Sequence, residues 1–210
     1  MRAWIVIAGQ ISASELDFYS SIKPAADDLV VCADGGYDNA VKFGIVPSII
    51  IGDMDSIIST VSPSIPTAIY PANKDKTDTH LAINYAIEKG ASEIVILGNN
   101  GGRIGHTLAN IALLRHISEA GLEGMLLSAN SRICLLKNGE TSISRGDSKY
   151  LSIIPLTSVC KGVSIMRAKY EMKDEILTAG DTRGVSNEFG VLDVKVSVKS
   201  GELLIIAERE

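Results

Sequence analysis

Up to about residue 120, short hydrophobic runs alternate with stretches whose apolar residues recur at helical spacing. The runs at 29–33, 48–51 and 93–97 are each followed by Asp or Gly and predict buried strands. The stretches at 37–43, 79–89 and 106–120 predict helices. Strands that alternate with helices indicate a parallel sheet with right-handed crossovers. This part of the chain is therefore predicted to be an α/β domain with a parallel, Rossmann-like sheet.

After residue 123 the helical pattern stops, and short apolar or alternating runs follow one another. Strands are predicted at 125–128, 133–137, 141–144, 150–155, 163–168, 191–198 and 203–207. Asn138-Gly139 predicts a tight hairpin between two of them, because this pair tolerates the positive φ angles of a type I′ turn. We therefore expect two domains, an α/β domain over 1–123 and an all-β sandwich over 124–210.

Charge and composition argue against nucleic-acid-binding, secreted and membrane proteins. The net charge is −5 and no cluster of lysine or arginine is present, so nucleic acid is not an expected partner. The first apolar run ends at Gln10, too early for a signal peptide, and no run approaches the roughly 18 apolar residues of a membrane span. Cys32, Cys134 and Cys160 are widely spaced and odd in number, which is typical of reduced thiols. These features predict a cytoplasmic protein without a membrane segment.

Acidic turns follow the predicted strands. Asp34 follows the run at 29–33, Asp53 and Asp55 follow the run at 48–51, and Asp78 stands at the start of a predicted helix. Because the carboxyl ends of parallel strands meet at one edge of a sheet, these acids are expected to lie close together. Neighbouring carboxylates repel one another unless a cation lies between them, and Mg²⁺ prefers oxygen ligands. The pattern therefore predicts a magnesium site.

A glycine-rich turn from Gly98 to His106 follows a further predicted strand and opens a helix. Such a turn suits a phosphate group, because backbone N–H groups at a helix start point toward the anion. The chain has neither the G-x-x-x-x-G-K-[ST] pattern of P-loop proteins nor a G-x-G-x-x-G after its first strand. Together with the acidic turns, this glycine-rich turn indicates a magnesium–nucleotide enzyme of another kind.

Each feature also has a purely structural interpretation. Asp34-Gly35-Gly36 suits a plain turn at the end of a strand. Asp53 suits a helix N-cap with an acidic first turn. Lys76 and Asp78 suit a solvated pair on the surface. The combination of these features in one half of the chain is what favours a catalytic site.

Five ordered motifs resemble one enzyme family. They are Ala33-Asp34-Gly35-Gly36, Gly52-Asp53-Met54-Asp55-Ser56, Lys74-Asp75-Lys76-Thr77-Asp78, Gly101-Gly102-Arg103 with His106-Thr107-Leu108-Ala109-Asn110, and Gly184-Val185-Ser186-Asn187-Glu188. In order and spacing they resemble the thiamine pyrophosphokinases. The resemblance implies an Mg²⁺-dependent transfer of the pyrophosphoryl group of ATP to the hydroxyl of thiamine, giving thiamine diphosphate and AMP. It also implies a homodimer whose thiamine site is completed at the subunit interface.

The resemblance further assigns roles to single residues. Asp53, Asp55 and Asp78 would bind the metal and handle phosphate, with Asp34 as the fourth catalytic carboxylate. ATP would be contacted by Lys76, Thr77, Gly101, Gly102, Arg103 and His106. Ser186 and Asn187, in the second half of the chain, match the family segment that meets thiamine.

Two departures from the family pattern affect these expectations. An acid usually precedes the histidine of the fourth motif, but this chain has Gly105 there. A missing general base commonly lowers a rate by about 10²–10⁴-fold, so a neighbouring acid would have to substitute. The second half also has no tryptophan to stack on thiamine. Phe189 is a candidate replacement, with a place in the core as the alternative.

Three other functions stay open. A haloacid-dehalogenase-like phosphohydrolase would use Asp53 as nucleophile, but its loop follows the first strand, and it needs a later acidic pair that the turn after Gly98 does not provide. A pyrophosphokinase for a pterin alcohol shares some of the acidic motifs. A degenerate module that binds nucleotide or thiamine without turnover would explain Gly105, whereas the intact carboxylates oppose it.

Overall fold

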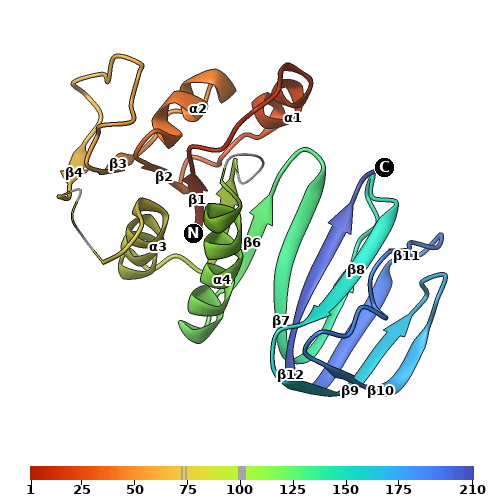
Figure 1. Ribbon diagram of the computed structural model, residues 1–210. Helices are drawn as coiled ribbons and strands as arrows, with labels where there is room; N and C mark the ends of the chain where they lie inside the picture. The colour runs from red at the N-terminus through yellow and green to blue at the C-terminus, as the bar shows by residue number, and fades with distance from the viewer. Residues whose placement is uncertain (72, 74, 99–102) are drawn as a thin grey trace. The chain divides into compact units, whose positions relative to one another are not determined.

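The computed structural model describes residues 1–71, 73, 75–98 and 103–210. The chain divides into two compact units, Met1–Ala129 and Asn130–Glu210 (Figure 1). The division falls beyond the predicted boundary after residue 123, because strand β6 (Glu123–Leu127) pairs in parallel with a strand of the first unit. The predicted α/β class is confirmed, since helices and parallel strands alternate along the first unit.

The first unit contains a sheet of parallel strands. They are β1 (Arg2–Val6), β2 (Leu29–Ala33), β3 (Ile49–Gly52), β4 (Thr67–Ile69), β5 (Glu93–Leu97) and β6, in the order β6-β5-β1-β2-β3-β4. Every pairing between these neighbours is parallel. The central strands read as continuous apolar runs because both of their faces are covered. Ile5, Ile50 and Ile96 are fully buried in this way.

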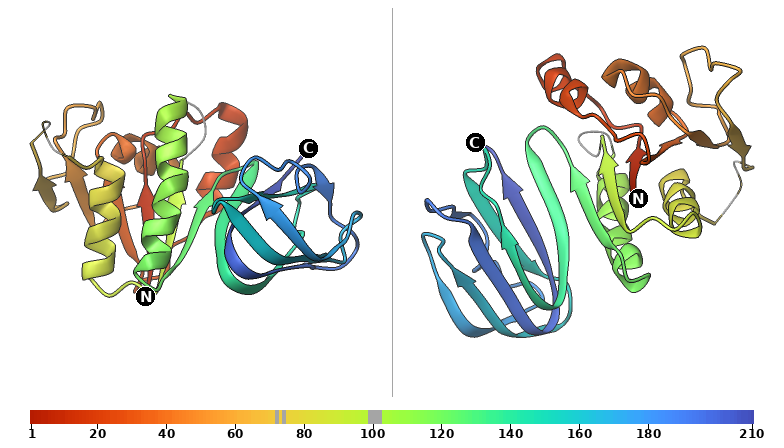
Figure 2. Two further views of the ribbon diagram at one scale, coloured as in Figure 1. Left: turned by 60° about the horizontal axis from the view of Figure 1, so that its bottom comes forward. Right: turned by 180° about the vertical axis from the view of Figure 1, so that it is seen from behind.

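Four α-helices among the described residues cover this sheet. They are α1 (Leu16–Ser21), α2 (Gly36–Phe43), α3 (Asp78–Glu88) and α4 (Ile104–Glu119), and a short 3₁₀-helix, η1 (Ala13–Glu15), precedes α1. Figures 1 and 2 show α1 and α2 on one face of the sheet and α3 and α4 on the other. None of the helices among the described residues has the length and apolarity needed to cross a membrane.

The order of the strands decides where a ligand can bind. From the neighbouring pair β1 and β5, the chain builds the sheet outward in both directions. In an open parallel sheet, such a reversal of strand order leaves a crevice at the carboxyl ends of the strands. Asp34, Asp53 and Gly98 directly follow the carboxyl ends of β2, β3 and β5.

The second unit consists of antiparallel strands. They are β7 (Ser131–Ile143), β8 (Tyr150–Pro155), β9 (Val159–Met166), β10 (Met172–Thr178), β11 (Asn187–Glu188) and β12 (Val194–Glu208). The long strand β12 pairs with β7 along both of its halves. Its first half also pairs with β9, and its second half pairs with β8. Leu151, Val163 and Leu203 belong to the buried core between these strands.

The hairpin predicted at Asn138-Gly139 is wrong. Strand β7 continues through this pair, and the positive φ of Asn138 (46°) bends the strand instead of reversing the chain. Asn138 Oδ1 accepts a hydrogen bond from Gly201 N at 2.8 Å. Gly201 lies where the pairing register of β12 shifts, between Val198 and Glu202. A positive φ is compatible with a β-bulge as well as with a turn. Asn138 therefore lies at an irregularity in the pairing of β7 with β12 and not at a hairpin turn.

Candidate functional site

Asp34 is a strained and buried carboxylate at the end of β2. Its φ of 46° lies in the left-handed region, which asparagine and aspartate tolerate better than most residues. Its backbone N–H donates to Ile51 O at 2.8 Å, and its carbonyl accepts from Tyr37 N at 3.0 Å. The residue is 8% exposed, and within the described part of the chain its buried Oδ1 has no hydrogen-bond partner. A buried oxygen without a partner is costly, so this position suits a ligand.

Asp53 and Asp55 form a tight turn after β3. Asp55 N donates to Asp53 Oδ1 at 3.3 Å, and Ser56 Oγ donates to Asp55 Oδ1 at 2.9 Å. Met54, between the two acids, has a φ of 67°. The turn leads into irregular chain, so the interpretation of Asp53 as a helix N-cap is wrong.

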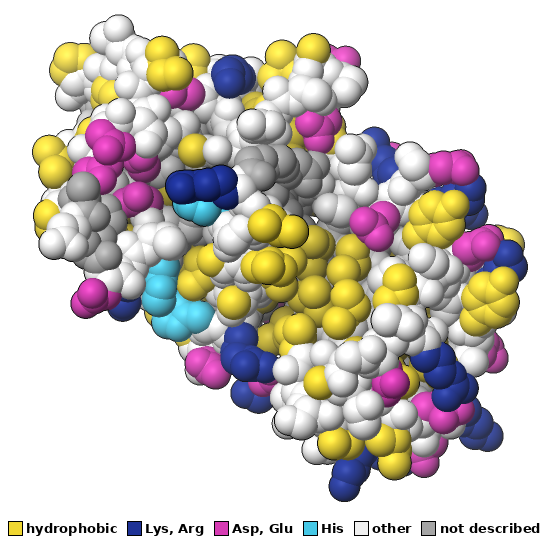
Figure 3. Space-filling view, in the orientation of Figure 1, with side chains coloured by type: hydrophobic (Ala, Val, Ile, Leu, Met, Phe, Trp, Pro, Cys, Tyr) yellow, Lys and Arg dark blue, Asp and Glu magenta, His cyan; other side chains and the backbone are white. Residues whose placement is uncertain are grey.

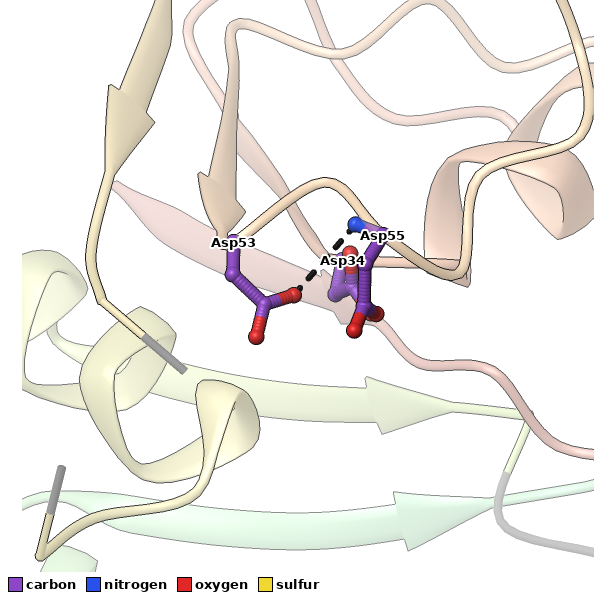
Figure 4. Close-up of side chains that lie close together, drawn as sticks. All are labelled: Asp34, Asp53 and Asp55. Atoms are coloured by element: carbon purple, nitrogen blue, oxygen red, sulfur yellow. Dashed lines mark hydrogen bonds between the residues drawn. The ribbon is translucent and has the colours of Figure 1, made fainter. Parts of the chain in front are cut away.

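The three carboxylates of Asp34, Asp53 and Asp55 face a common space (Figure 4). Each offers an oxygen, and these oxygens all lie within 4.8 Å of one another. Like charges this close repel strongly, and hard oxygen donors are the ligands of Mg²⁺. The unsatisfied Oδ1 of Asp34 and this donor set together fit a magnesium ion.

Gly52 allows this cluster to form. A Cβ at Gly52 would lie 2.8 Å from Asp34 Cβ and 3.2 Å from Asp78 Oδ1, and the φ of Gly52 is 157°. Any side chain here would push Asp34 away from its place. The close approach therefore requires glycine, which gives the Gly52-Asp53-Met54-Asp55 motif a steric reason.

Asp78 lies beside this cluster rather than in it. It is the first residue of α3, and Thr77 is the N-cap, with its Oγ1 accepting from His80 N at 3.2 Å. The structure therefore groups Asp34 with Asp53 and Asp55, whereas the sequence analysis grouped Asp78 with them as metal ligands. Lys76, also assigned to ATP, is exposed next to the cap.

A cleft of about 450 Å³ at the carboxyl edge of the first unit brings most of the expected residues together. Its lining includes Asp34, Asp53, Asp55, Thr77, Asp78, Arg103 and His106. In Figure 3, acidic, basic and histidine side chains lie on the same face of this unit. Arg103 precedes α4 and His106 lies in its first turn, so both come from the helix that the glycine-rich turn opens. Gly101 and Gly102 lie outside the described residues.

The loop after β1 is a part of the cleft that sequence reasoning missed. Ile7, Gly9 and Gln10 line the cleft. Asn39, 3% exposed on α2, donates through Nδ2 to Ile7 O and to Gly9 O, each at 2.9 Å. A buried amide that bonds two carbonyls fixes the shape of this loop. The one sequence signal for it was a polar residue on the buried face of a predicted helix.

The second unit presents the segment around Ser186 and Asn187. Ser186 is exposed with a φ of 59°, and its N–H donates to Ser152 Oγ at 3.1 Å. Asn187 is 3% exposed, and its amide bonds the backbone of Tyr170: Oδ1 accepts from Tyr170 N at 3.0 Å and Nδ2 donates to Tyr170 O at 2.7 Å. The Asn187 side chain therefore positions the backbone of Tyr170. The Tyr170 side chain itself is 59% exposed.

Phe189 does not provide an exposed ring. It is 9% exposed and belongs to the core of the second unit. Its role as the aromatic partner of thiamine is therefore not supported, and the core alternative is the correct one. Tyr170, an exposed aromatic residue that sequence reasoning missed, lies next to the same segment through its bonds to Asn187.

Comparison with known families covers both units. The family profile described as "Thiamin pyrophosphokinase, catalytic domain" matches residues 24–126. The profile described as "Thiamin pyrophosphokinase, vitamin B1 binding domain" matches residues 140–203.

Individual relatives and solved structures agree with these matches. The chain is 32% identical to a protein of Bacillus subtilis (strain 168) named thiamine pyrophosphokinase, over 76% of this chain and 78% of that protein. It is 26% identical to thiamin pyrophosphokinase 1 of Caenorhabditis elegans, over 84% of this chain and 77% of that one. A crystal structure of the thiamine pyrophosphokinase from Bacillus subtilis matches with a TM-score of 0.87 and 27% identity, covering 100% of both chains. A structure of a thiamin pyrophosphokinase family protein from Enterococcus faecalis gives a TM-score of 0.83 at 26% identity, again over 100% of both chains.

Proposed function

Because this chain belongs to the thiamine pyrophosphokinase family, we propose that it transfers the pyrophosphoryl group of ATP to the primary hydroxyl of thiamine. The products are thiamine diphosphate and AMP. The observation that carries the proposal is the cluster of Asp34, Asp53 and Asp55, with the unsatisfied buried oxygen of Asp34, in a cleft that the Arg103 side chain also lines. The parallel unit acts as a Rossmann-like nucleotide domain, and the antiparallel unit acts as a β-sandwich that binds thiamine.

In this reaction the thiamine oxygen forms a bond to the β-phosphorus of ATP. The bond between the β-phosphorus and the oxygen that bridges to the α-phosphate breaks, and AMP leaves with that electron pair. The proton of the hydroxyl passes to a carboxylate of the cleft, for which Asp55 is the most exposed of the three clustered acids. Such a transfer depends mainly on positioning and on stabilisation of charge, because the protein forms no covalent bond.

The residues of the cleft divide these tasks. Asp34, Asp53 and Asp55 would hold Mg²⁺, and the bound ion supplies positive charge that offsets the phosphate oxygens. Asp78 borders the same space from the start of α3. Arg103 presents a planar guanidinium suited to two phosphate oxygens at once. His106, Thr77 and Lys76 complete the set of groups assigned to the triphosphate.

Thiamine would bind against the segment of Ser186 and Asn187 in the second unit. Ser186 offers a hydroxyl at the exposed end of this segment, and Asn187 acts by holding Tyr170. Lys169 Nζ lies 5.3 Å from the centroid of the Tyr170 ring, and the cationic thiazolium would make a cation–π contact of the same kind with this ring. We further propose a cytoplasmic homodimer whose thiamine site is completed by the second subunit.

A module that binds its ligands without turnover is the second candidate, and Gly105 is the observation that favours it. Among the described residues, a Cβ added at Gly105 would meet no atom within 4 Å, which leaves room for an acidic side chain on their side. Replacing Gly105 with aspartate is expected to leave kcat/KM for thiamine unchanged or to raise it, because it restores a carboxylate beside His106. Gly105→Asn, of the same size but without charge, is the matched control. A Gly105→Asp variant that folds but loses activity would contradict this role of the acid.

The reaction is tested by incubating the protein with ATP, Mg²⁺ and thiamine and separating the products by chromatography. We expect AMP and thiamine diphosphate in equal amounts, and neither when thiamine is omitted. ADP or free phosphate would indicate a hydrolase or another kinase. Turnover with a pterin alcohol but not with thiamine would indicate the other pyrophosphokinase. Binding of both ligands by calorimetry without turnover would indicate the degenerate module.

A further inference from the structure

Two histidines form a pair between helices α3 and α4 of the first unit. The ring centroids of His80, on α3, and His116, on α4, lie 4.7 Å apart, with an angle of 59° between the ring planes. Both side chains are half-buried, and neither lines the acidic cleft. Figure 3 shows adjoining histidine side chains at the surface of this unit. The five motifs assign no role to this pair.

His80 has a ring nitrogen without a partner. Its Nε2 is buried, and no hydrogen-bond partner for it exists within the part of the chain that the structure describes. A buried polar atom in this state costs free energy unless a further group satisfies it. A neutral imidazole can present a lone pair at this atom, and such a lone pair binds metal ions.

His116 is held in the orientation of a metal-binding histidine. Its Nε2 lies 2.7 Å from Asn84 Oδ1. An amide oxygen only accepts hydrogen bonds, so Nε2 carries the hydrogen and the lone pair of the neutral ring is on Nδ1. Histidines that bind a metal commonly donate their second N–H to an oxygen in this way, which fixes the ring and its tautomer. Asn84 lies one helical turn after His80, so α3 supplies both the partner ring and the group that orients His116.

We propose that His80 and His116 together bind a divalent transition-metal ion of the Zn²⁺, Ni²⁺ or Cu²⁺ class between α3 and α4. With metal–nitrogen bonds of about 2.0–2.1 Å and ligand angles of roughly 90–109°, two imidazole rings on one ion have centroids about 4.5–5.2 Å apart. The separation of 4.7 Å in this protein lies within that range.

The chemistry of the donors selects the ion. Imidazole nitrogen suits Zn²⁺, Ni²⁺ and Cu²⁺, whereas Mg²⁺ prefers oxygen. The histidine pair and the carboxylate cluster therefore favour different ions. Among the described residues, no third His, Cys, Asp or Glu joins the pair in a metal-binding group, so water completes the coordination. The bound ion would join α4 to α3, the helix that begins with Asp78 at the cleft.

Calorimetric titration with Zn²⁺, in millimolar Mg²⁺, tests the site. His80→Gln and His116→Gln are each expected to weaken binding of Zn²⁺ by more than about tenfold, because each removes a ligand. Asn84→Ala is expected to weaken it by about tenfold through loss of the group that orients His116. Neither histidine is fully buried, so both glutamine variants are expected to fold, which Trp4 fluorescence during urea unfolding verifies.

The matched control is His106→Gln, which removes the third histidine of the chain and should leave this Zn²⁺ affinity unchanged. If both His80→Gln and His116→Gln bind Zn²⁺ as tightly as the unchanged protein, the ion lies elsewhere and the pair is only a ring contact. Electron paramagnetic resonance of the unchanged protein with one equivalent of Cu²⁺ tests the same site without a variant. Couplings to two imidazole nitrogens are expected, and a spectrum with oxygen ligands alone would overturn the proposal.

Discussion

Replacing Asp55 with asparagine is expected to lower kcat for thiamine diphosphate formation by about 10²–10⁴-fold, the range found when a group that stabilises transferring charge or accepts a proton is lost. Asparagine keeps the size of the side chain and the acceptor for Ser56 Oγ, whose bond to Asp55 Oδ1 is 2.9 Å. It removes one of three negative charges whose oxygens lie within 4.8 Å. The measurement is a steady-state assay at saturating ATP, thiamine and Mg²⁺.

For stability, we expect the opposite effect of Asp55→Asn: it should not destabilise the protein. Without Mg²⁺, Asp55→Asn should be at least as stable as the unchanged protein, because it relieves repulsion among the carboxylates. Mg²⁺ should raise the unfolding midpoint of the unchanged protein and have a smaller effect on the variant. Asp27→Asn, at an exposed acid outside the cleft, controls for the loss of a charge. Activity within about threefold of the unchanged protein would contradict the metal assignment.

Gly36→Ala is expected to destabilise the first unit by about 3 kcal/mol, at the upper end of the usual cost of overpacking a core. A Cβ at Gly36 would lie 2.0 Å from Val6 O and 2.9 Å from Ile7 Cα. Both contacts are with backbone, so no side chain can rotate away and α2 or β1 has to move. Trp4, the single tryptophan, lies in β1, and its fluorescence reports urea unfolding of this unit.

Gly105→Ala is the matched control, because Gly105 is also a helical glycine near the start of its helix. No atom of the part of the chain that the structure describes lies within 4 Å of its added Cβ. Alanine here is expected to stabilise by about 0.5–1 kcal/mol through reduced backbone entropy of the unfolded chain. Equal stability of Gly36→Ala and the unchanged protein would contradict the close approach of α2 to the end of β1.

The central part of the first unit was predictable because its signals are local. Strands buried on both faces must be apolar throughout, and β2 and β5 match the predicted runs at 29–33 and 93–97. The short strand β4 was missed, because its three residues, Thr67–Ile69, are not buried and carry no such run. The hairpin at Asn138-Gly139 failed because a positive φ at one residue does not distinguish a turn from a bulge.

The composition of the candidate site was predictable, but its grouping was not. Parallel topology indicated that Asp34, Asp53 and Asp55 share an edge of the sheet. The place of Asp34 within the carboxylate cluster depends on the close approach at Gly52, which only three-dimensional packing defines. Likewise, Asn187 was chosen for thiamine, whereas its amide bonds the backbone of Tyr170, a partner 17 residues away that no local pattern indicates.

The most direct test of the proposed reaction follows the phosphates of ATP individually. Two batches of ATP, labelled with ³²P at the α- or the γ-phosphate, are incubated with Mg²⁺, thiamine and the protein, and the products are separated. The account predicts that the γ-label appears in thiamine diphosphate and the α-label in AMP, in equal molar amounts. A γ-label in free phosphate or in thiamine monophosphate, accompanied by an α-label in ADP, would contradict transfer of the whole pyrophosphoryl group.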